Sequence, residues 1–124
     1  MRKFSDYLLV AIVVFVIGVG YVANRAVQRG ERETREIALR STLTRTRGAI
    51  DQFWGVKGEL PHSLDDLVNM KLIDKIPLDP LTNTENWQLV IGTRSDGSKQ
   101  RSGVVNLHST SSAISSEGTS YNTW

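Results

Sequence analysis

A small set of side chains in the second half of the chain could support catalysis or metal binding. His62 and His108 are candidate metal ligands, but they are far apart in the sequence, and the chain has no cysteine to complete a site. Protein zinc sites are usually built from closely spaced His and Cys residues. The pattern therefore favours surface or capping roles for both histidines, and we predict no resident metal.

The acids and one serine offer a second kind of chemistry, acid–base or nucleophilic catalysis. A triad of Ser109, His108 and Asp79 has the right residue types, but no nucleophile-elbow pattern surrounds the serine. Capping and local hydrogen bonds explain the acids, because they stand at the start of a short helix or in a proline-rich turn. The acids considered are Asp65, Asp66, Asp74 and Asp79. We predict that the chain is not an enzyme.

Length and charge restrict the elements that could position these side chains. The chain has 124 residues and a net charge of +2, which allows one small domain with a modest core. Arg and Glu are interleaved between Arg25 and Arg47, so they do not form a basic face. Nucleic acid is therefore not an expected partner. The absence of cysteine also excludes disulfides and thiol catalysis.

The stretch YLLVAIVVFVIGVGYVA, from Tyr7 to Ala23, carries no charge and is rich in branched apolar residues. As a helix it extends for roughly 25 Å, near the lower limit for crossing a bilayer core. We predict a membrane anchor over residues 1–24 and a water-soluble domain over residues 25–124. A signal peptide and a buried core helix are the alternatives. The predicted anchor residues include Tyr7, Leu8, Val13, Phe15, Val16 and Tyr21.

The orientation of this segment follows from the flanking charges. Arg2 and Lys3 precede it, whereas four arginines follow it between Arg25 and Arg35. The positive-inside rule, applied to charge alone, places the domain in the cytoplasm.

The helical pattern continues well beyond the apolar stretch. No proline interrupts the chain from Asn24 to Trp54, and an unbroken helix from Ser5 to Trp54 is about 75 Å long. Gly30 and Gly48 are the expected places for a bend. One face of the second half carries the residues that are expected to pack on a core: Leu39, Leu43, Thr46, Ile50 and Phe53, with Trp54 beside them.

The rest of the chain predicts a short helix followed by strands. Ser63 is the expected N-cap of the short helix, with Asp66 as the capping-box acid, and the prolines of KIPLDPLTN then stop helix formation. Strands are expected at 86–93 and 103–110, with an Asp96-Gly97 turn in the connection between them. The Ser/Thr-rich tail is expected to be irregular and pinned by Tyr121 and Trp124. The predicted fold class is α+β, a long helix packed on a small antiparallel sheet.

Several stretches, taken in order, resemble a known family. After the apolar helix come AIDQFWGVKGELPHSLDDLV, IPLDPLTNTENWQLV, and GVVNLHSTSS with SEGTSYNTW. This order resembles the pseudopilins and type IV pilin-like proteins of bacterial secretion and pilus machines, especially the major pseudopilins of type II secretion systems. The resemblance covers nearly the whole chain.

The resemblance implies a non-enzymatic component that builds or primes a filament, with its domain outside the bacterial inner membrane, in the periplasm or extracellular space. We follow the family topology on this point over the count of arginines. It implies pilin-like subunits and machine proteins as partners, and a turn that switches the chain from helix to sheet. Some pseudopilins bind calcium in the C-terminal loop, where this chain offers only Glu117 as a carboxylate. The residues that the resemblance marks as structural are Pro61, Pro77, Asp79, Pro80, Trp87, Tyr121 and Trp124.

The N-terminus departs from the family pattern. Family precursors carry a glycine before the mature N-terminal residue and a glutamate at the fifth mature position, whereas here Lys3 precedes Phe4 and Leu8 is the fifth residue from Phe4. Asp6 is the only nearby acid. We therefore expect no cleavage by a prepilin peptidase, so that the protein keeps its Arg2-Lys3 segment. A single-pass membrane adaptor that never enters a filament is the alternative function.

Overall fold

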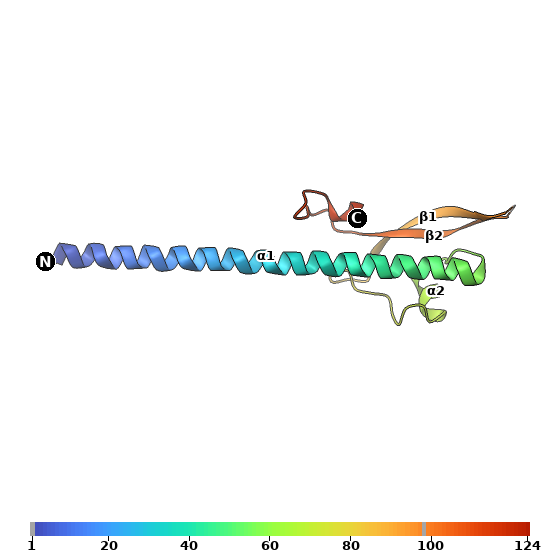
Figure 1. The fold of residues 1–124 in the computed structure, drawn as a ribbon, viewed down its shortest axis with the longest axis horizontal. Coiled ribbons are helices and arrows are strands. Elements are labelled where there is room, and N and C mark those ends of the chain that lie inside the picture. The colour runs from blue at the N-terminus through green and yellow to red at the C-terminus, as the bar shows by residue number, and fades with distance from the viewer. Residues whose placement is uncertain (1, 98) are drawn as a thin grey trace. The chain divides into compact units, whose positions relative to one another are not determined.

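The computed structural model describes residues 2–97 and 99–124, apart from the side chain of Arg2. The elements are the helix α1 (Arg2–Lys57), the helix α2 (Leu64–Asn69), the strands β1 (Trp87–Asp96) and β2 (Lys99–Ser109), and the short 3-10 helix η1 (Tyr121–Thr123) (Figure 1). The predicted α+β class, with a long N-terminal helix packed on a small antiparallel sheet, is confirmed. Met1, the first residue of the predicted anchor, lies outside the described residues.

The chain divides into two compact units, although α1 is continuous through the division. The first unit ends at Thr34, and the second runs from Arg35 to Trp124. In the first unit every described side chain is exposed. The second unit holds the hydrophobic core, so the packing that defines the fold lies there.

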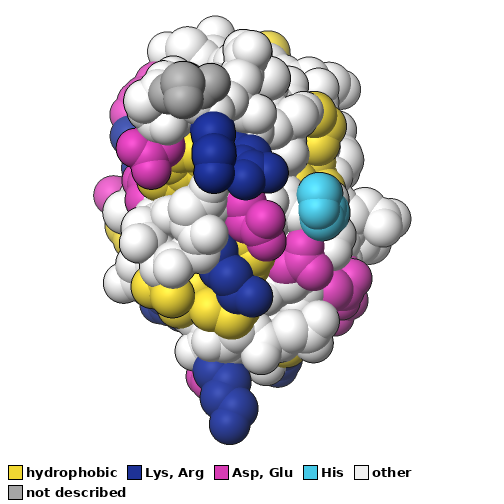
Figure 2. Space-filling view, turned by 90° about the vertical axis from the view of Figure 1, so that its right-hand side faces the viewer, with side chains coloured by type: hydrophobic (Ala, Val, Ile, Leu, Met, Phe, Trp, Pro, Cys, Tyr) yellow, Lys and Arg dark blue, Asp and Glu magenta, His cyan; other side chains and the backbone are white. Residues whose placement is uncertain are grey.

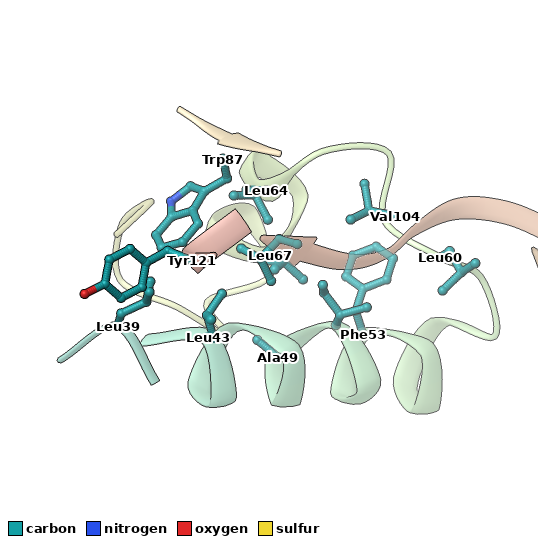
Figure 3. Close-up of a cluster of buried hydrophobic side chains, with 12 residues drawn as sticks. Leu39, Leu43, Ala49, Phe53, Leu60, Leu64, Leu67, Trp87, Val104 and Tyr121 are labelled. Atoms are coloured by element: carbon teal, nitrogen blue, oxygen red, sulfur yellow. The ribbon is translucent and has the colours of Figure 1, made fainter. Parts of the chain in front are cut away.

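The core forms where one face of α1 meets the rest of the second unit. Leu39, Leu43, Thr46, Ile50 and Phe53 are all buried, as the sequence pattern predicts. Figure 3 shows side chains of α1 pointing from one face of the helix toward the other residues of the cluster. Each fully buried leucine contributes about 1.5–3 kcal/mol to stability. The residues that complete the core are Ala49, Leu60, Leu64, Leu67, Trp87, Val104, Leu107 and Tyr121.

The strands β1 and β2 form a two-stranded antiparallel hairpin. Trp87 pairs with Ser109 at its base and Asp96 pairs with Lys99 at its tip. The register shifts between Val90 and Ile91, whose partners are Asn106 and Val104. This β-bulge leaves one extra residue on β2 and changes which of its side chains face the core.

The hairpin turn lies one residue later than the sequence pattern predicts. The strands extend to Asp96 and Lys99, so the connection begins at Gly97 and not at Asp96. Gly97 has a φ of 63°, a conformation that glycine adopts at no steric cost. Much of the segment expected to be loop is therefore paired strand. The other residue of the connection, Ser98, lies outside the described residues.

The start of α2 also differs from the predicted capping box. Ser63 is the N-cap residue, but its side chain makes no capping hydrogen bond. The carboxylate of Asp66 instead accepts a hydrogen bond from the main-chain N–H of His62 at 2.7 Å. The acid therefore binds the residue before the cap, which ties α2 to the loop that precedes it.

The confinement of the core to the second unit leads to the first testable prediction. Residues 25–124, expressed without the apolar segment, are expected to be soluble, folded and monomeric, because every core side chain lies after Thr34. Circular dichroism and light scattering test this expectation. Aggregation with loss of secondary structure would show that the apolar segment contributes to folding of the domain.

Candidate functional site

The first candidate site is the apolar segment near the N-terminus. An 18-residue window there has a mean hydropathy of 2.3 and contains no buried residue. The predicted anchor side chains are between 54% and 73% exposed: Tyr7, Leu8, Val13, Phe15, Val16 and Tyr21. By length and composition this helix can cross a membrane.

Exposure distinguishes this segment from the helical core of a soluble protein. An apolar helix in such a core is covered by the surrounding chain, whereas here the exposed side chains lie on all sides of the helix. Water is an unfavourable environment for a surface of this kind, because each fully exposed apolar side chain forgoes about 1.5–3 kcal/mol of burial free energy. By its composition and exposure, the segment is suited to an apolar environment such as a bilayer core.

The second candidate site is the proline-rich turn around Asp79. The side chain of Asp79 is fully buried. The Asp79 carboxylate accepts hydrogen bonds from the main-chain N–H of Leu81 at 2.9 Å and from the Ser109 hydroxyl at 2.5 Å. Its main-chain N–H donates to the carbonyl oxygen of Thr84, and its own carbonyl accepts from the N–H of Asn83. One buried acid thus closes the turn and fastens it to the end of β2.

The prolines contribute through their carbonyl oxygens. The indole Nε1–H of Trp87 donates to the carbonyl of Pro77 at 2.8 Å, which connects the turn to β1. The carbonyl of Pro61 accepts from the N–H of Val104 at 2.8 Å, so the loop before α2 lies along the outer edge of β2. Pro80 follows Asp79 and is partly buried. These contacts hold the loops against the hairpin.

The three residues of the conceivable catalytic triad do not form a triad. Ser109 donates directly to Asp79, whereas Nδ1 of His108 contacts the main-chain oxygen of Trp124. Neighbouring residues of a strand point to opposite faces, so His108 does not lie between the serine and the acid. The short Ser109–Asp79 contact is a structural hydrogen bond in this arrangement.

The metal candidates are dispersed. Within residues 2–97 and 99–124 there is no cluster of three or more His, Asp or Glu side chains that could hold a metal ion. His62 is exposed, and His108 is partly buried on β2. The Glu117 carboxylate, the one calcium candidate of the C-terminal loop, forms an ion pair with Arg40 at 2.7 Å.

Glu36 is a functional candidate that the sequence analysis missed. It is only 6% exposed, and its Oε1 accepts hydrogen bonds from the Tyr121 hydroxyl at 2.6 Å and the Ser116 N–H at 2.7 Å. Its Oε2 accepts from the Ser116 hydroxyl at 2.5 Å. This glutamate therefore binds the C-terminal loop to α1. The sequence contains one indication of this burial. Glu36 lies three residues before Leu39 and seven before Leu43, which places it on the core-facing stripe of the helix.

A second testable prediction concerns this carboxylate. Glu36→Gln is expected to lower the free energy of unfolding by about 1 kcal/mol, because an amide offers one acceptor oxygen in place of two. We also expect faster proteolytic cleavage within residues 113–124. Glu33→Gln, at an exposed position of α1, is the matched control and is expected to leave both measurements unchanged. Equal behaviour of the two variants would contradict the assigned role of Glu36.

Arginine side chains of α1 hold the last residues of the chain. Arg47 donates through Nε to the Asn106 side-chain oxygen at 2.6 Å, and through Nη2 to the main-chain oxygens of Leu107 at 2.9 Å and Trp124 at 2.7 Å. Burial lowers the pKa of the Arg47 guanidinium from its ordinary value, although the group stays charged at physiological pH. The Arg40 guanidinium lies 4.2 Å from the centre of the Trp124 ring. The tail is therefore pinned by Tyr121 and Trp124, as predicted.

Two open hollows lie on the second unit. The larger, of about 490 Å³, is lined by Arg40, Arg47 and Trp124 among others, which already bind one another or the C-terminal loop. The smaller, of about 270 Å³, lies between α1 and residues 72–77.

The outer surface shows no single dominant charge on the face drawn in Figure 2. Lys and Arg side chains alternate there with Asp and Glu, and the hydrophobic atoms form small separate patches. Comparison of the chain with protein-family models, with curated proteins and with solved structures gives no match.

Proposed function

We propose that this protein is a non-enzymatic, membrane-anchored structural component of a bacterial type II secretion or type IV pilus-type machine, with its domain on the outer side of the inner membrane. One observation carries the proposal. A single continuous helix, Arg2–Lys57, carries an exposed apolar stretch in the first unit and the core-facing stripe of a small α+β domain in the second. That division suits a subunit held in a bilayer at one end.

The contacts of the domain support a structural role. Its buried polar side chains, including Glu36, Asp79 and Ser109, bind other parts of the same domain. Buried polar side chains that bind within the domain hold its loops in position. The order of these loops along the chain resembles that of the pseudopilins. We therefore infer that the domain serves as a rigid module that other machine proteins contact.

A second candidate is an adaptor of such a machine that never enters a filament. The residues at the start of the apolar segment favour this candidate, because Lys3 precedes Phe4 and Leu8 occupies the position at which pseudopilins carry glutamate. The two candidates differ in what surrounds the apolar helix. In a filament its neighbours are equivalent helices at regular intervals, whereas around an adaptor they are lipids or one partner.

Cysteine cross-linking in the membranes of the native host distinguishes the two candidates, and the cysteine-free chain makes it specific. Val13→Cys and Val16→Cys place a thiol on exposed positions of the apolar segment. A filament subunit is expected to give a ladder of regularly spaced oligomers, while an adaptor is expected to give monomer or a single adduct.

The control is Lys99→Cys, at an exposed position of the hairpin. It reports collisions that do not depend on packing of the apolar helix. A ladder of equal intensity from Lys99→Cys would contradict helix packing as its cause. Recovery of unmodified chain from the soluble fraction would contradict membrane residence itself.

A further inference from the structure

We propose that Arg25 and Arg29 bind the phosphate groups of anionic lipids at the membrane surface that follows the apolar segment, with Tyr21 setting the depth of the helix. The inference rests on the proposed membrane residence and adds the class of lipid to it. All of its residues lie in the first unit, which ends at Thr34.

The order of charges along the helix is the first observation. After the uncharged stretch that ends at Ala23, Arg25 and Arg29 are the first charged residues, and the first acid is Glu31. At about 1.5 Å of rise per residue, these two arginines lie within about 10 Å of the end of the apolar stretch. That distance is comparable to one Debye length at physiological ionic strength, so both positive charges act on the bilayer surface. The first acid, Glu31, lies further along the helix from that surface.

The geometry of Tyr21 and Arg25 is the second observation. The Arg25 guanidinium lies 5.0 Å from the centre of the Tyr21 ring, and both side chains are exposed. Tyrosine is enriched at the level of lipid headgroups because its ring is apolar and its hydroxyl is polar. The contact therefore holds a guanidinium at the depth where lipid phosphates are found.

The third observation is that the two arginines share a helix face and that their N–H donors are not used by other side chains of the described residues. Residues four apart lie one above the other on a helix, which places Arg29 above Arg25. Within residues 2–97 and 99–124, neither guanidinium donates a hydrogen bond to another side chain. By contrast, Arg40, Arg47 and Arg94 of the second unit bind acceptors of the domain.

The chemistry of the guanidinium favours phosphate as the ligand. Its planar set of N–H donors binds two phosphate oxygens at once, and a juxtamembrane arginine is attracted to an anionic leaflet. A zwitterionic headgroup offers the same phosphate with a compensating cation beside it. We therefore expect preference for an anionic lipid, such as phosphatidylglycerol, over phosphatidylcholine.

The test uses the full chain reconstituted in phosphatidylcholine vesicles that contain a minor fraction of phosphatidylglycerol. Electron paramagnetic resonance of spin-labelled lipids measures how much of each lipid is immobilised by the protein. We expect the protein to immobilise phosphatidylglycerol about threefold more strongly than phosphatidylcholine. The Arg25→Gln and Arg29→Gln double variant is expected to lose this preference.

The matched control is the Lys99→Gln and Arg101→Gln double variant, which removes the same charge from exposed positions of the hairpin. It is expected to keep the preference. Addition of inorganic phosphate, compared with chloride at equal ionic strength, is expected to change nothing. Loss of the preference with phosphate alone would overturn the lipid as the ligand and indicate a general phosphate site.

Flotation of the same vesicles separates this inference from the proposed function. Chain that floats with the vesicles but immobilises both lipids equally would overturn the lipid preference and leave the anchor intact. Chain that fails to float would overturn the anchor, and the lipid site with it. An equal loss of preference in both double variants would also contradict the site, because it would trace the effect to total charge.

Discussion

Replacing Asp79 with alanine is expected to lower the free energy of unfolding of residues 25–124 by about 2–4 kcal/mol. The buried carboxylate accepts two hydrogen bonds, one from the Leu81 N–H and one from the Ser109 hydroxyl. Alanine leaves both donors without this acceptor, and it removes the link between the proline turn and β2. Urea unfolding followed by tryptophan fluorescence measures the loss, because Trp87 lies against the same turn.

Two further variants make this prediction specific. Asp74→Ala changes an exposed acid of the preceding loop and is expected to shift stability by no more than about 0.5 kcal/mol. Ser109→Ala removes the same contact from its other side. In the double-mutant cycle we expect a coupling energy of at least about 1 kcal/mol between Asp79 and Ser109. Strict additivity of the two changes would show that their hydrogen bond contributes nothing to stability.

The second large effect is expected from Gly103→Ala, which should lower the free energy of unfolding by about 3 kcal/mol. A Cβ atom at Gly103 would lie 2.6 Å from the Leu60 Cβ and 2.8 Å from the Pro61 carbonyl oxygen. These atoms belong to a tightly held loop, since the same carbonyl accepts the hydrogen bond from Val104. The methyl group is expected to separate the loop from β2 and to break this bond.

The same substitution on α1 provides the control. A Cβ at Gly55 meets no atom within 4 Å, and the residue is exposed. Because alanine has the higher helix propensity, Gly55→Ala is expected to stabilise the domain by up to about 1 kcal/mol. The two alanine variants should thus shift the unfolding midpoint in opposite directions. A Gly103→Ala variant as stable as the parent would contradict the close approach of the loop.

The main helix and its core face were predictable because they depend on local periodicity. The spacing of Leu39, Leu43, Ile50 and Phe53 identifies one face of a helix, and all four are buried. The apolar stretch was equally clear from composition alone. The proline turn was predicted as a structural element, but its main contact was not. Asp79 and Ser109 are 30 residues apart, and no local pattern indicates that pairing.

Glu36 shows why the polar contacts were harder to predict than the apolar ones. It lies in a run of alternating Arg and Glu residues that is typical of a solvated helix surface. Its burial depends on Ser116 and Tyr121, which are 80 and 85 residues further along the chain. A charged side chain becomes favourable in a buried position only when such partners are present.

The bulge limited the prediction of the hairpin. In a regular strand, core-facing residues alternate, whereas on β2 the buried Val104 and Leu107 are three residues apart. The extra residue between them, Val105, resets the alternation. Hydrophobic periodicity predicts two strands here, but it does not predict where the register changes.

The hydrogen bonds that join α1 to the C-terminal loop have a consequence for the time course of folding. The bonds from Arg40 to Glu117 and from Arg47 to Trp124 each span 77 residues. The pairs of the hairpin, from Asp96–Lys99 to Trp87–Ser109, are much closer in sequence. Long-range contacts of this kind slow folding, because loop closure precedes any gain from the contact. The hairpin can therefore form before the C-terminal loop reaches α1, and the contacts of Glu117 and Trp124 with α1 are expected to form late in folding.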